Sequence, residues 1–188
     1  FQHQLNPEHP LWNLPTAVRL IGPFDDRAFE RALGELVLRH EALRTTYRSC
    51  DGQPLRVIHA DMPVPVTRTD LRAIPGPERE ARLPPLMRAE ARRPFDLALG
   101  PLVRCAIYRL GKVERVVLLT MHHIISDGWS MDVMVRELAA VYFAAVRGVP
   151  APLRPLELQY PDFACWQRRV LTEDVLSTHV GFWKEHLA

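Results

Sequence analysis

Two apolar, β-rich runs separated by Gly111 and Lys112 are the strongest hydrophobic pattern in this 188-residue chain. Residues 102–110 and 115–122 are rich in branched apolar side chains, and their short connection predicts an antiparallel hairpin. Beyond a short loop, apolar side chains recur at helical spacing and predict a helix that ends near Gly148. The residues of that helical face are Met131, Met134, Val135, Leu138, Tyr142 and Ala145.

The first part of the chain alternates strand and helix signals. Residues 17–21 form a short β-run, after which Asp25 or Asp26 is a natural N-cap for a helix. The apolar face of that helix consists of Phe29, Ala32, Leu33, Leu36, Val37 and His40. Turn residues 51–54 predict a hairpin between 43–48 and 55–59, and residues 64–68 suggest a further strand.

The chain contains 17 prolines, and several of them mark the boundaries of the remaining segments. Pro84 and Pro85 interrupt a helical stretch within residues 69–101 and predict a break or kink there. A proline-rich crossing over residues 150–161 leads to two short helices, near 162–169 and 179–187. Because strands and helices are mixed, we expect an α/β fold: a two-layer sandwich with a mixed sheet and packed helices.

Composition excludes several classes of protein. The chain is 47% apolar and 24% charged with a net charge of +2, which argues against disorder. The longest apolar runs, 116–121 and 139–146, are shorter than the roughly 20 residues of a membrane span. No leader of the secretory type opens the sequence, so we expect a cytoplasmic protein with no membrane attachment. Acidic and basic residues are interleaved, so we expect no binding of nucleic acid.

The three cysteines, Cys50, Cys105 and Cys165, have no paired short spacing. This pattern argues against a disulfide framework and against a cysteine-based zinc site, and it fits a reducing compartment.

Residues 121–130, Met-His-His-Ile-Ile-Ser-Asp-Gly-Trp-Ser, follow the apolar strand and open the long helix. If the strand continues through His122 and His123, the two side chains project from opposite faces, so one packs inward and the other reaches a site. Adjacent strand histidines do not easily share one ion, which argues against a metal. A purely structural interpretation stays open, with core histidines, Asp127 as an N-cap and Gly128 as a flexible corner.

Two other segments carry candidate chemistry. Residues 39–47 read Arg-His-Glu-Ala-Leu-Arg-Thr-Thr-Tyr, in which Arg39 and Arg44 are candidate counter-charges for a buried Asp127 or are both solvated. His40 lies in the middle of the apolar helix face, which favours a packed histidine. Residues 160–166 combine three aromatic side chains with Asp162 and, taken alone, indicate core or a hydrophobic platform.

Together the three segments resemble the condensation domain of nonribosomal peptide synthetases, a member of the chloramphenicol acetyltransferase superfamily. Residues 122–128 match that family's HHxxxDG signature, and residues 39–47 are similar to its RHExLRTxF motif, with Tyr47 in place of Phe. Residues 160–166 resemble its YxDFAxW motif. The further motif positions are Trp129, Ser130, Tyr160, Asp162 and Trp166.

The resemblance implies that residues 1–188 are the N-terminal, acetyltransferase-like lobe of a two-lobed domain, lacking the family's opening motif and the second lobe. By the family pattern His123 is the catalytic residue and His122 is structural. Asp127 is expected to pair with an arginine of the earlier motif, Arg39 rather than Arg44. Gly128 is expected to leave space beside the histidine.

The resemblance also implies the reaction and its partners. The amine of an acceptor aminoacyl thioester attacks the carbonyl of a donor thioester, with an L-configured donor favoured. Both substrates arrive on phosphopantetheine carried by donor and acceptor peptidyl carrier proteins. The second lobe and an adjacent adenylation domain are further expected partners, and the lobe itself binds no cofactor and no metal. Whether His123 acts as a base or as a positioning or stabilising group stays open.

Four alternatives remain after the resemblance is taken into account. An epimerization domain and a non-catalytic recruitment domain share the fold. A glycerolipid acyltransferase would use an HxxxxD spacing, which His122 and Asp127 satisfy, but it would need phosphate-binding and membrane-attachment features that are not found. An isolated lobe without activity is the fourth alternative.

Overall fold

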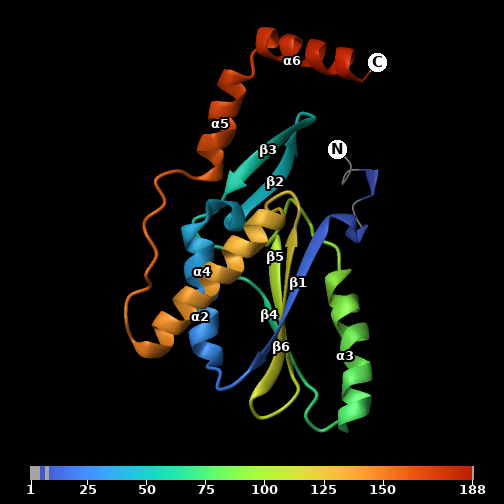
Figure 1. Ribbon diagram of the computed structural model, residues 1–188, viewed down its shortest axis with the longest axis vertical. Helices are drawn as coiled ribbons and strands as arrows, with labels where there is room; N and C mark the ends of the chain where they lie inside the picture. The colour runs from blue at the N-terminus through green and yellow to red at the C-terminus, as the bar shows by residue number, and fades with distance from the viewer. Residues whose placement is uncertain (1–4, 7–8, 188) are drawn as a thin grey trace. The chain divides into compact units, whose positions relative to one another are not determined.

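The computed structural model describes residues 5–6 and 9–187, which divide into two compact units. The first unit comprises the described residues up to Arg154, and the second starts at Pro155. The first unit contains a four-stranded sheet of order β1-β6-β5-β4 (Figure 1). Its strands are β1 (Asn13–Ile21), β4 (Val66–Asp70), β5 (Val103–Arg109) and β6 (Glu114–His122). A separate hairpin pairs β2 (Thr45–Cys50) with β3 (Gln53–Ile58).

The sheet is mixed, as the sequence predicts. Strands β5 and β6 form the predicted antiparallel hairpin, in which Val103 lies opposite Met121. Strand β4 is parallel to β5, and β1 is antiparallel to β6 at the edge of the sheet. The prediction for β1 was four residues too short, because the strand starts at Asn13 and includes Pro15. A proline that lacks an N–H is tolerated in an edge strand.

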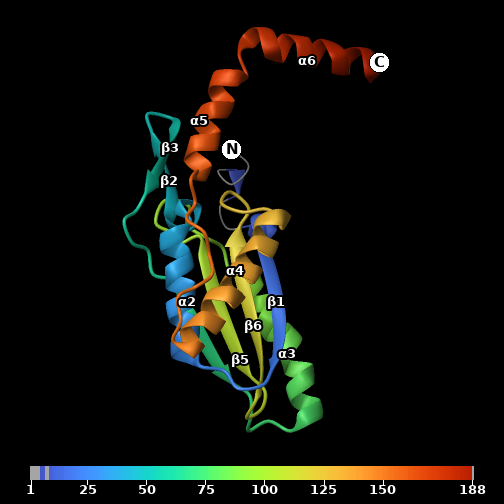
Figure 2. The ribbon, with the colours of Figure 1, turned by 60° about the vertical axis from the view of Figure 1, so that its left-hand side comes forward.

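Helices cover both faces of this sheet (Figure 2). Helices α2 (Asp26–Arg39) and α4 (Gly128–Arg147) pack on one face, where Leu36, Ile107 and Leu119 belong to the larger core. Helix α3 (Gly76–Ala91) packs on the other face through Leu83, against residues such as Leu118. The expected mixed sheet with packed helices is confirmed, and α3 adds a layer on the second face. Central strands covered on both faces explain the nearly continuous apolar runs in β5 and β6.

The predicted break at Pro84 and Pro85 is wrong, because α3 is continuous through both prolines. Leu83 is buried against the sheet, and Met87 packs against the same cluster one turn later. The end of the helix is held as well, since the Asn13 amide donates to the carbonyl oxygens of Ala91 (2.7 Å) and Arg93 (2.8 Å). Packing and these bonds offset the backbone hydrogen bonds that two prolines remove.

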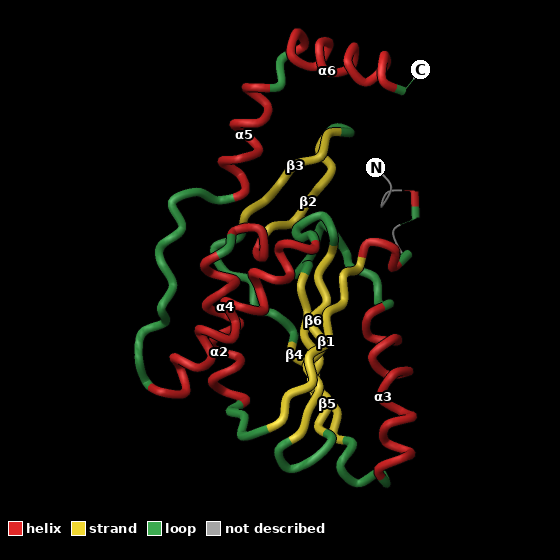
Figure 3. Tube along the Cα trace, viewed as in Figure 1, coloured by secondary structure: helices red, strands yellow, loops and turns green. Residues whose placement is uncertain are grey.

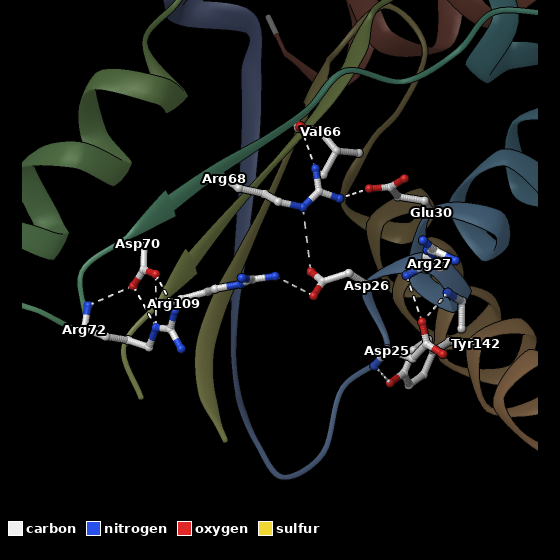
Figure 4. A network of polar contacts seen from close by, with 11 residues as sticks. Asp25, Asp26, Arg27, Glu30, Val66, Arg68, Asp70, Arg72, Arg109 and Tyr142 are labelled. Carbon is white, nitrogen blue, oxygen red and sulfur yellow. Dashed lines mark hydrogen bonds and ion pairs between the residues drawn. The ribbon is translucent and has the colours of Figure 1, made fainter. Parts of the chain in front are cut away.

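The first turn of α2 is tied to the sheet by ion pairs at the end farthest from His122 (Figure 4). Asp25 is the N-cap and accepts from the backbone N–H groups of Arg27 and Ala28. The Arg109 guanidinium lies 2.6 Å from Asp26 Oδ2, and Arg68 pairs with Asp26 and Glu30. The strand rise places this network about 25 Å from His122.

The second unit consists of an extended segment followed by α5 (Tyr160–Val170) and α6 (Glu173–His186) (Figure 3). Both helices occur where the sequence predicts them and are longer than predicted. Neither helix has a buried residue, and even the large side chains of Trp166 and Trp183 are each 57% exposed. Across the described residues, none of the helices has both the length and the apolar character to cross a membrane.

Candidate active site

His122 and His123 are adjacent in the chain but lie in opposite environments. His122 is the last residue of β6 and is only 5% exposed, whereas His123 is exposed at the start of the loop that leads to α4. Figures 1 and 2 show this loop between β2 and the end of β1 that follows η1 (Pro10–Trp12). The structure therefore sends one histidine into the core and the other to the surface.

The His122 side chain is held by packed and hydrogen-bonded neighbours. Its Nδ1 accepts from the backbone N–H of Ile124 at 3.0 Å, and its ring meets the Phe95 ring edge-on at 6.1 Å. On the same ring of Phe95, the Arg104 guanidinium lies 4.0 Å from the centroid. Arg104 is 5% exposed and pairs with Glu90 at 2.8 Å. Burial lowers the pKa of Arg104, and the Glu90 carboxylate opposes that shift.

The His123 ring is fixed in one tautomer by a backbone carbonyl. Its Nδ1 lies 2.8 Å from the carbonyl oxygen of Ser126. Because a carbonyl oxygen only accepts, Nδ1 must be the donor, so the neutral ring carries its lone pair on Nε2. The Trp12 ring contacts the imidazole edge-on at 5.9 Å, and the backbone N–H of His123 donates to the Trp12 carbonyl at 2.7 Å. An exposed, oriented Nε2 is able to accept a proton from a substrate.

The loop after His123 is closed by short-range bonds. The carbonyl of His122 accepts from the backbone N–H of Ile125 and from Ser126 Oγ, each at 3.1 Å. Ile125 and Ser126 are buried, whereas Ile124 is 40% exposed. This turn brings the Ser126 carbonyl back to the His123 ring.

Asp127 is the N-cap of α4, as the structural interpretation of the motif proposed. Its Oδ1 accepts from the backbone N–H (2.8 Å) and from Oγ (2.6 Å) of Ser130. These two bonds hold the pKa of the carboxyl below its usual value. The side chain is exposed, so the predicted buried ion pair of Asp127 with Arg39 or Arg44 is wrong. Ser130, three residues along the chain, satisfies this carboxylate locally.

Arg39 lies instead against Glu137 of α4. The Arg39 Nε is 3.1 Å and the His40 Nε2 is 2.7 Å from Glu137 Oε2. Burial opposes ionisation of Glu137, but the hydrogen bonds from His40 and Arg39 outweigh it and lower its pKa. His40 is therefore a hydrogen-bonded histidine rather than one packed only by apolar groups. Arg44 donates to the His59 carbonyl at 2.5 Å.

Gly128 begins α4 with space around it. A Cβ built on this residue meets nothing within 4 Å, and its φ is not positive. Gly148, at the other end of α4, has a φ of 67° that favours glycine. The backbone therefore requires glycine at the end of the helix and not at its start.

All of residues 1–188 match the condensation domain family. The chain belongs to the condensation domain family.

Relatives of this condensation-domain chain are parts of much larger proteins. It is 44% identical to a linear gramicidin synthase protein of Brevibacillus parabrevis, covering 100% of the chain and 2% of that protein. Identity to the phosphinothricin tripeptide synthetase PhsC of Streptomyces viridochromogenes is 42%, over 100% of the chain and 17% of the relative. The solved structure of SgcC5 from Streptomyces globisporus is 31% identical with a TM-score of 0.82, over 96% of this chain and 41% of that one. The chain thus spans less than half the length of each of these relatives.

The remaining condensation-domain motif positions lie on α4 and α5. Trp129 is 77% exposed on the first turn of α4, next to Ser130, which bonds Asp127. In the second unit, Asp162 Oδ2 accepts from the backbone N–H of Gln159 at 2.8 Å and thereby caps α5. Tyr160 and Trp166 of the same helix are exposed. The structure therefore assigns local structural contacts to Ser130 and Asp162.

Three sets of contacts in the site were missed by sequence reasoning: those of Trp12 and of Tyr47 with the histidine loop, and those of Glu137 with Arg39 and His40. Glu137 had a signal in the sequence, since it lies three residues after Met134 and four before Val141, an acid on the buried face of the helix. The contacts of Trp12 and Tyr47 with the histidine loop had no such signal, because they join segments more than 70 residues apart.

An apolar pocket of about 180 Å³ lies in the first unit but away from His123. It is bounded by β1, β6 and α4, with Val18, Leu119 and Phe143 among its lining residues. Within the described ranges 5–6 and 9–187, no three His, Cys, Asp or Glu side chains are grouped as metal ligands would be.

Proposed function

We propose that this chain is the N-terminal lobe of a condensation domain that forms amide bonds, with His123 as its catalytic residue. The observation that carries the proposal is the exposed His123 ring, whose Nδ1 is bonded to the Ser126 carbonyl so that Nε2 is presented as an acceptor. The family assignment supplies the reaction class.

In the proposed reaction, the amine nitrogen of an acceptor aminoacyl thioester attacks the carbonyl carbon of a donor thioester. The C–N bond forms, the C–S bond of the donor breaks through a tetrahedral adduct, and one amine proton is transferred by way of Nε2 to the departing thiolate. An amine with a pKa near 8 is already partly neutral at pH 7. The main contributions of His123 are therefore to orient the attacking N–H and to accept its proton as the adduct forms.

The proposed partners follow from the size of the relatives. Because the chain covers 41% of the solved relative SgcC5, a second lobe is proposed to complete the walls of the site. Donor and acceptor peptidyl carrier proteins are proposed to deliver both thioesters on phosphopantetheine, and an adenylation domain to load them. The large synthetases among the relatives support this arrangement. An L-configured donor remains part of the proposal.

His123→Ala in the two-lobed domain tests the function. We expect single-turnover dipeptide formation from preloaded carriers to fall by about 10²- to 10⁴-fold. Because the ring is exposed, the free energy of unfolding should stay within about 0.5 kcal/mol of wild type.

His186→Ala is a matched control, since the His186 Nδ1 also bonds a backbone carbonyl, that of Phe182, at 3.0 Å. It should leave the rate unchanged. Dipeptide formation by His123→Ala at a near-normal rate would remove this residue from the mechanism.

A further inference from the structure

We infer that Trp12 and Tyr47, two aromatic residues outside the histidine motif, are positioning residues that hold the His123 loop from two sides. The inference rests on the proposed function of His123. Trp12 precedes β1 and Tyr47 lies in β2, so the loop between β6 and α4 is held by two segments that are distant from it in the sequence.

Trp12 holds the first residue of the loop. Its carbonyl accepts the backbone N–H of His123 at 2.7 Å, which extends the β1–β6 ladder one step beyond the pair Asn13–His122. Its indole then meets the imidazole edge-on, with 5.9 Å between centroids and 61° between planes. Such aromatic contacts favour one orientation of the smaller ring.

Tyr47 holds the second residue. Its hydroxyl donates to the carbonyl oxygen of Ile124 at 3.3 Å. The Tyr47 ring packs against the larger core, and its backbone N–H donates to the Leu97 carbonyl at 2.7 Å, so the hydroxyl is presented by a fixed element. The phenylalanine of the family motif that Tyr47 replaces has no hydroxyl for this bond.

These contacts complement the bonds within the loop. The Ser126 carbonyl sets the tautomer of His123 but belongs to the same turn, so it moves with the ring. The Ile124 carbonyl held by Tyr47 lies one residue beyond His123, so a displacement of Ile124 would shift the backbone that carries the imidazole. Trp12 and Tyr47 tie this segment to β1 and β2, and small displacements of a catalytic group are costly in rate.

Substitutions in the two-lobed domain test the inference. Tyr47→Phe should lower kcat by about 2- to 10-fold with KM unchanged, since it removes one hydrogen bond. Trp12→Leu should lower kcat by a similar factor of about 2 to 10, and Trp12→Phe, which keeps an aromatic edge, should recover most of the loss. Tyr142→Phe is the matched control, because the Tyr142 hydroxyl bonds the Asp25 backbone N–H, far from His123.

Two further measurements separate this inference from the proposed function. Amide hydrogen exchange at Ile124 to Ser126 should accelerate in Tyr47→Phe and Trp12→Leu, and not in Tyr142→Phe, whatever reaction the domain performs. In a His123→Ala background, Tyr47→Phe should no longer affect the residual rate, because its effect passes through the ring.

Unchanged kcat and unchanged exchange in both variants would overturn the inference, as would a loss confined to KM. An unaffected rate in His123→Ala, combined with faster loop exchange in Tyr47→Phe, would contradict the proposed function while leaving the loop contacts intact.

Discussion

The inner and outer sides of the β6 end use the same residue type for different purposes. On the inner side, His122 is buried beside Phe95 and, behind that ring, the ion pair of Arg104 with Glu90. On the outer side, His123 is exposed and is held by backbone carbonyls and the edge of one aromatic ring.

The contrast separates buried groups that stabilise the fold from exposed groups that the fold only holds in position for a substrate. Removing an inner group leaves buried polar atoms without partners, which is costly in stability. Removing an outer group exposes little and should affect chemistry alone. The two sides therefore predict opposite results for stability and for rate.

The largest expected effect on stability is at Arg104. Arg104→Ala should lower the free energy of unfolding by about 3 kcal/mol, because it removes a buried guanidinium that pairs with Glu90 and donates to the backbone carbonyls of Glu90 and Arg93. Chemical denaturation measures the loss. Arg93→Ala is the control, since Arg93 pairs with the same Glu90 but its side chain is 58% exposed, and it should cost less than about 1 kcal/mol. Equal losses of stability in the two variants would show that the buried pair of Arg104 with Glu90 stabilises the fold no more than the exposed pair of Arg93 with Glu90 does.

Glu137 supplies the next effect, with a defined pH dependence. Glu137→Gln should cost about 2 kcal/mol at pH 7 by weakening the bonds from Arg39 and His40. Because the folded pKa of Glu137 is lowered, the unfolded state binds more protons below the ordinary value of 4.5. The carboxylate's contribution is thus complete above about pH 4.5 and is lost as the pH falls through the folded value.

Unfolding free energies of wild type and Glu137→Gln, measured from pH 7 down to pH 3, test that sign. The difference between the two proteins should shrink as the solution becomes acidic. A difference that is constant or grows with acidity would show that the carboxylate is not ionised in the folded protein.

Gly128 tests the prediction that a residue on the outer side affects the rate and not the stability. A Cβ at this position meets nothing within 4 Å, so Gly128→Ala should not lower the melting temperature. It should nevertheless reduce kcat/KM by about 10-fold by crowding an approaching thioester, a loss of about 1.4 kcal/mol in transition-state stabilisation. Gly34→Ala in α2 also meets nothing within 4 Å and serves as the control, with no change in rate. Full activity in Gly128→Ala would show that the open space is not used.

Asp127 carries the smallest effect. As an exposed N-cap, its replacement by alanine should cost about 1 kcal/mol, with soluble and folded protein retained. Thermal unfolding measures this. A loss of several kcal/mol would instead favour the buried ion pair that the sequence suggested and the structure does not contain.

Local patterns in the sequence were enough to predict most of the first unit. The β5–β6 hairpin and the length of α4 follow from apolar periodicity between turn residues and a glycine at the C-cap. The opposite orientations of His122 and His123 follow from alternation at a strand end. These features depend on neighbours along the chain, which is why a single sequence reveals them.

Features set by distant contacts were not predictable. The continuity of α3 through Pro84 and Pro85 depends on packing of Leu83 against β-strands that follow it in the chain. The partner of Arg39 is chosen by how α2 and α4 pack, which brings Glu137 rather than Asp127 to it. In the second unit the helix signals were correct, but the three aromatic side chains of residues 160–166 are exposed and do not form core.

Chemical modification by diethyl pyrocarbonate tests the central contrast most directly, because it reports on each histidine of the folded protein separately. Tandem mass spectrometry of the peptide that contains both residues should show His123 modified first, in parallel with loss of amide formation, and His122 modified only after unfolding. Equal modification of the two residues in the folded protein, or earlier modification of His122, would contradict the assignment of one histidine to the core and the other to the reaction.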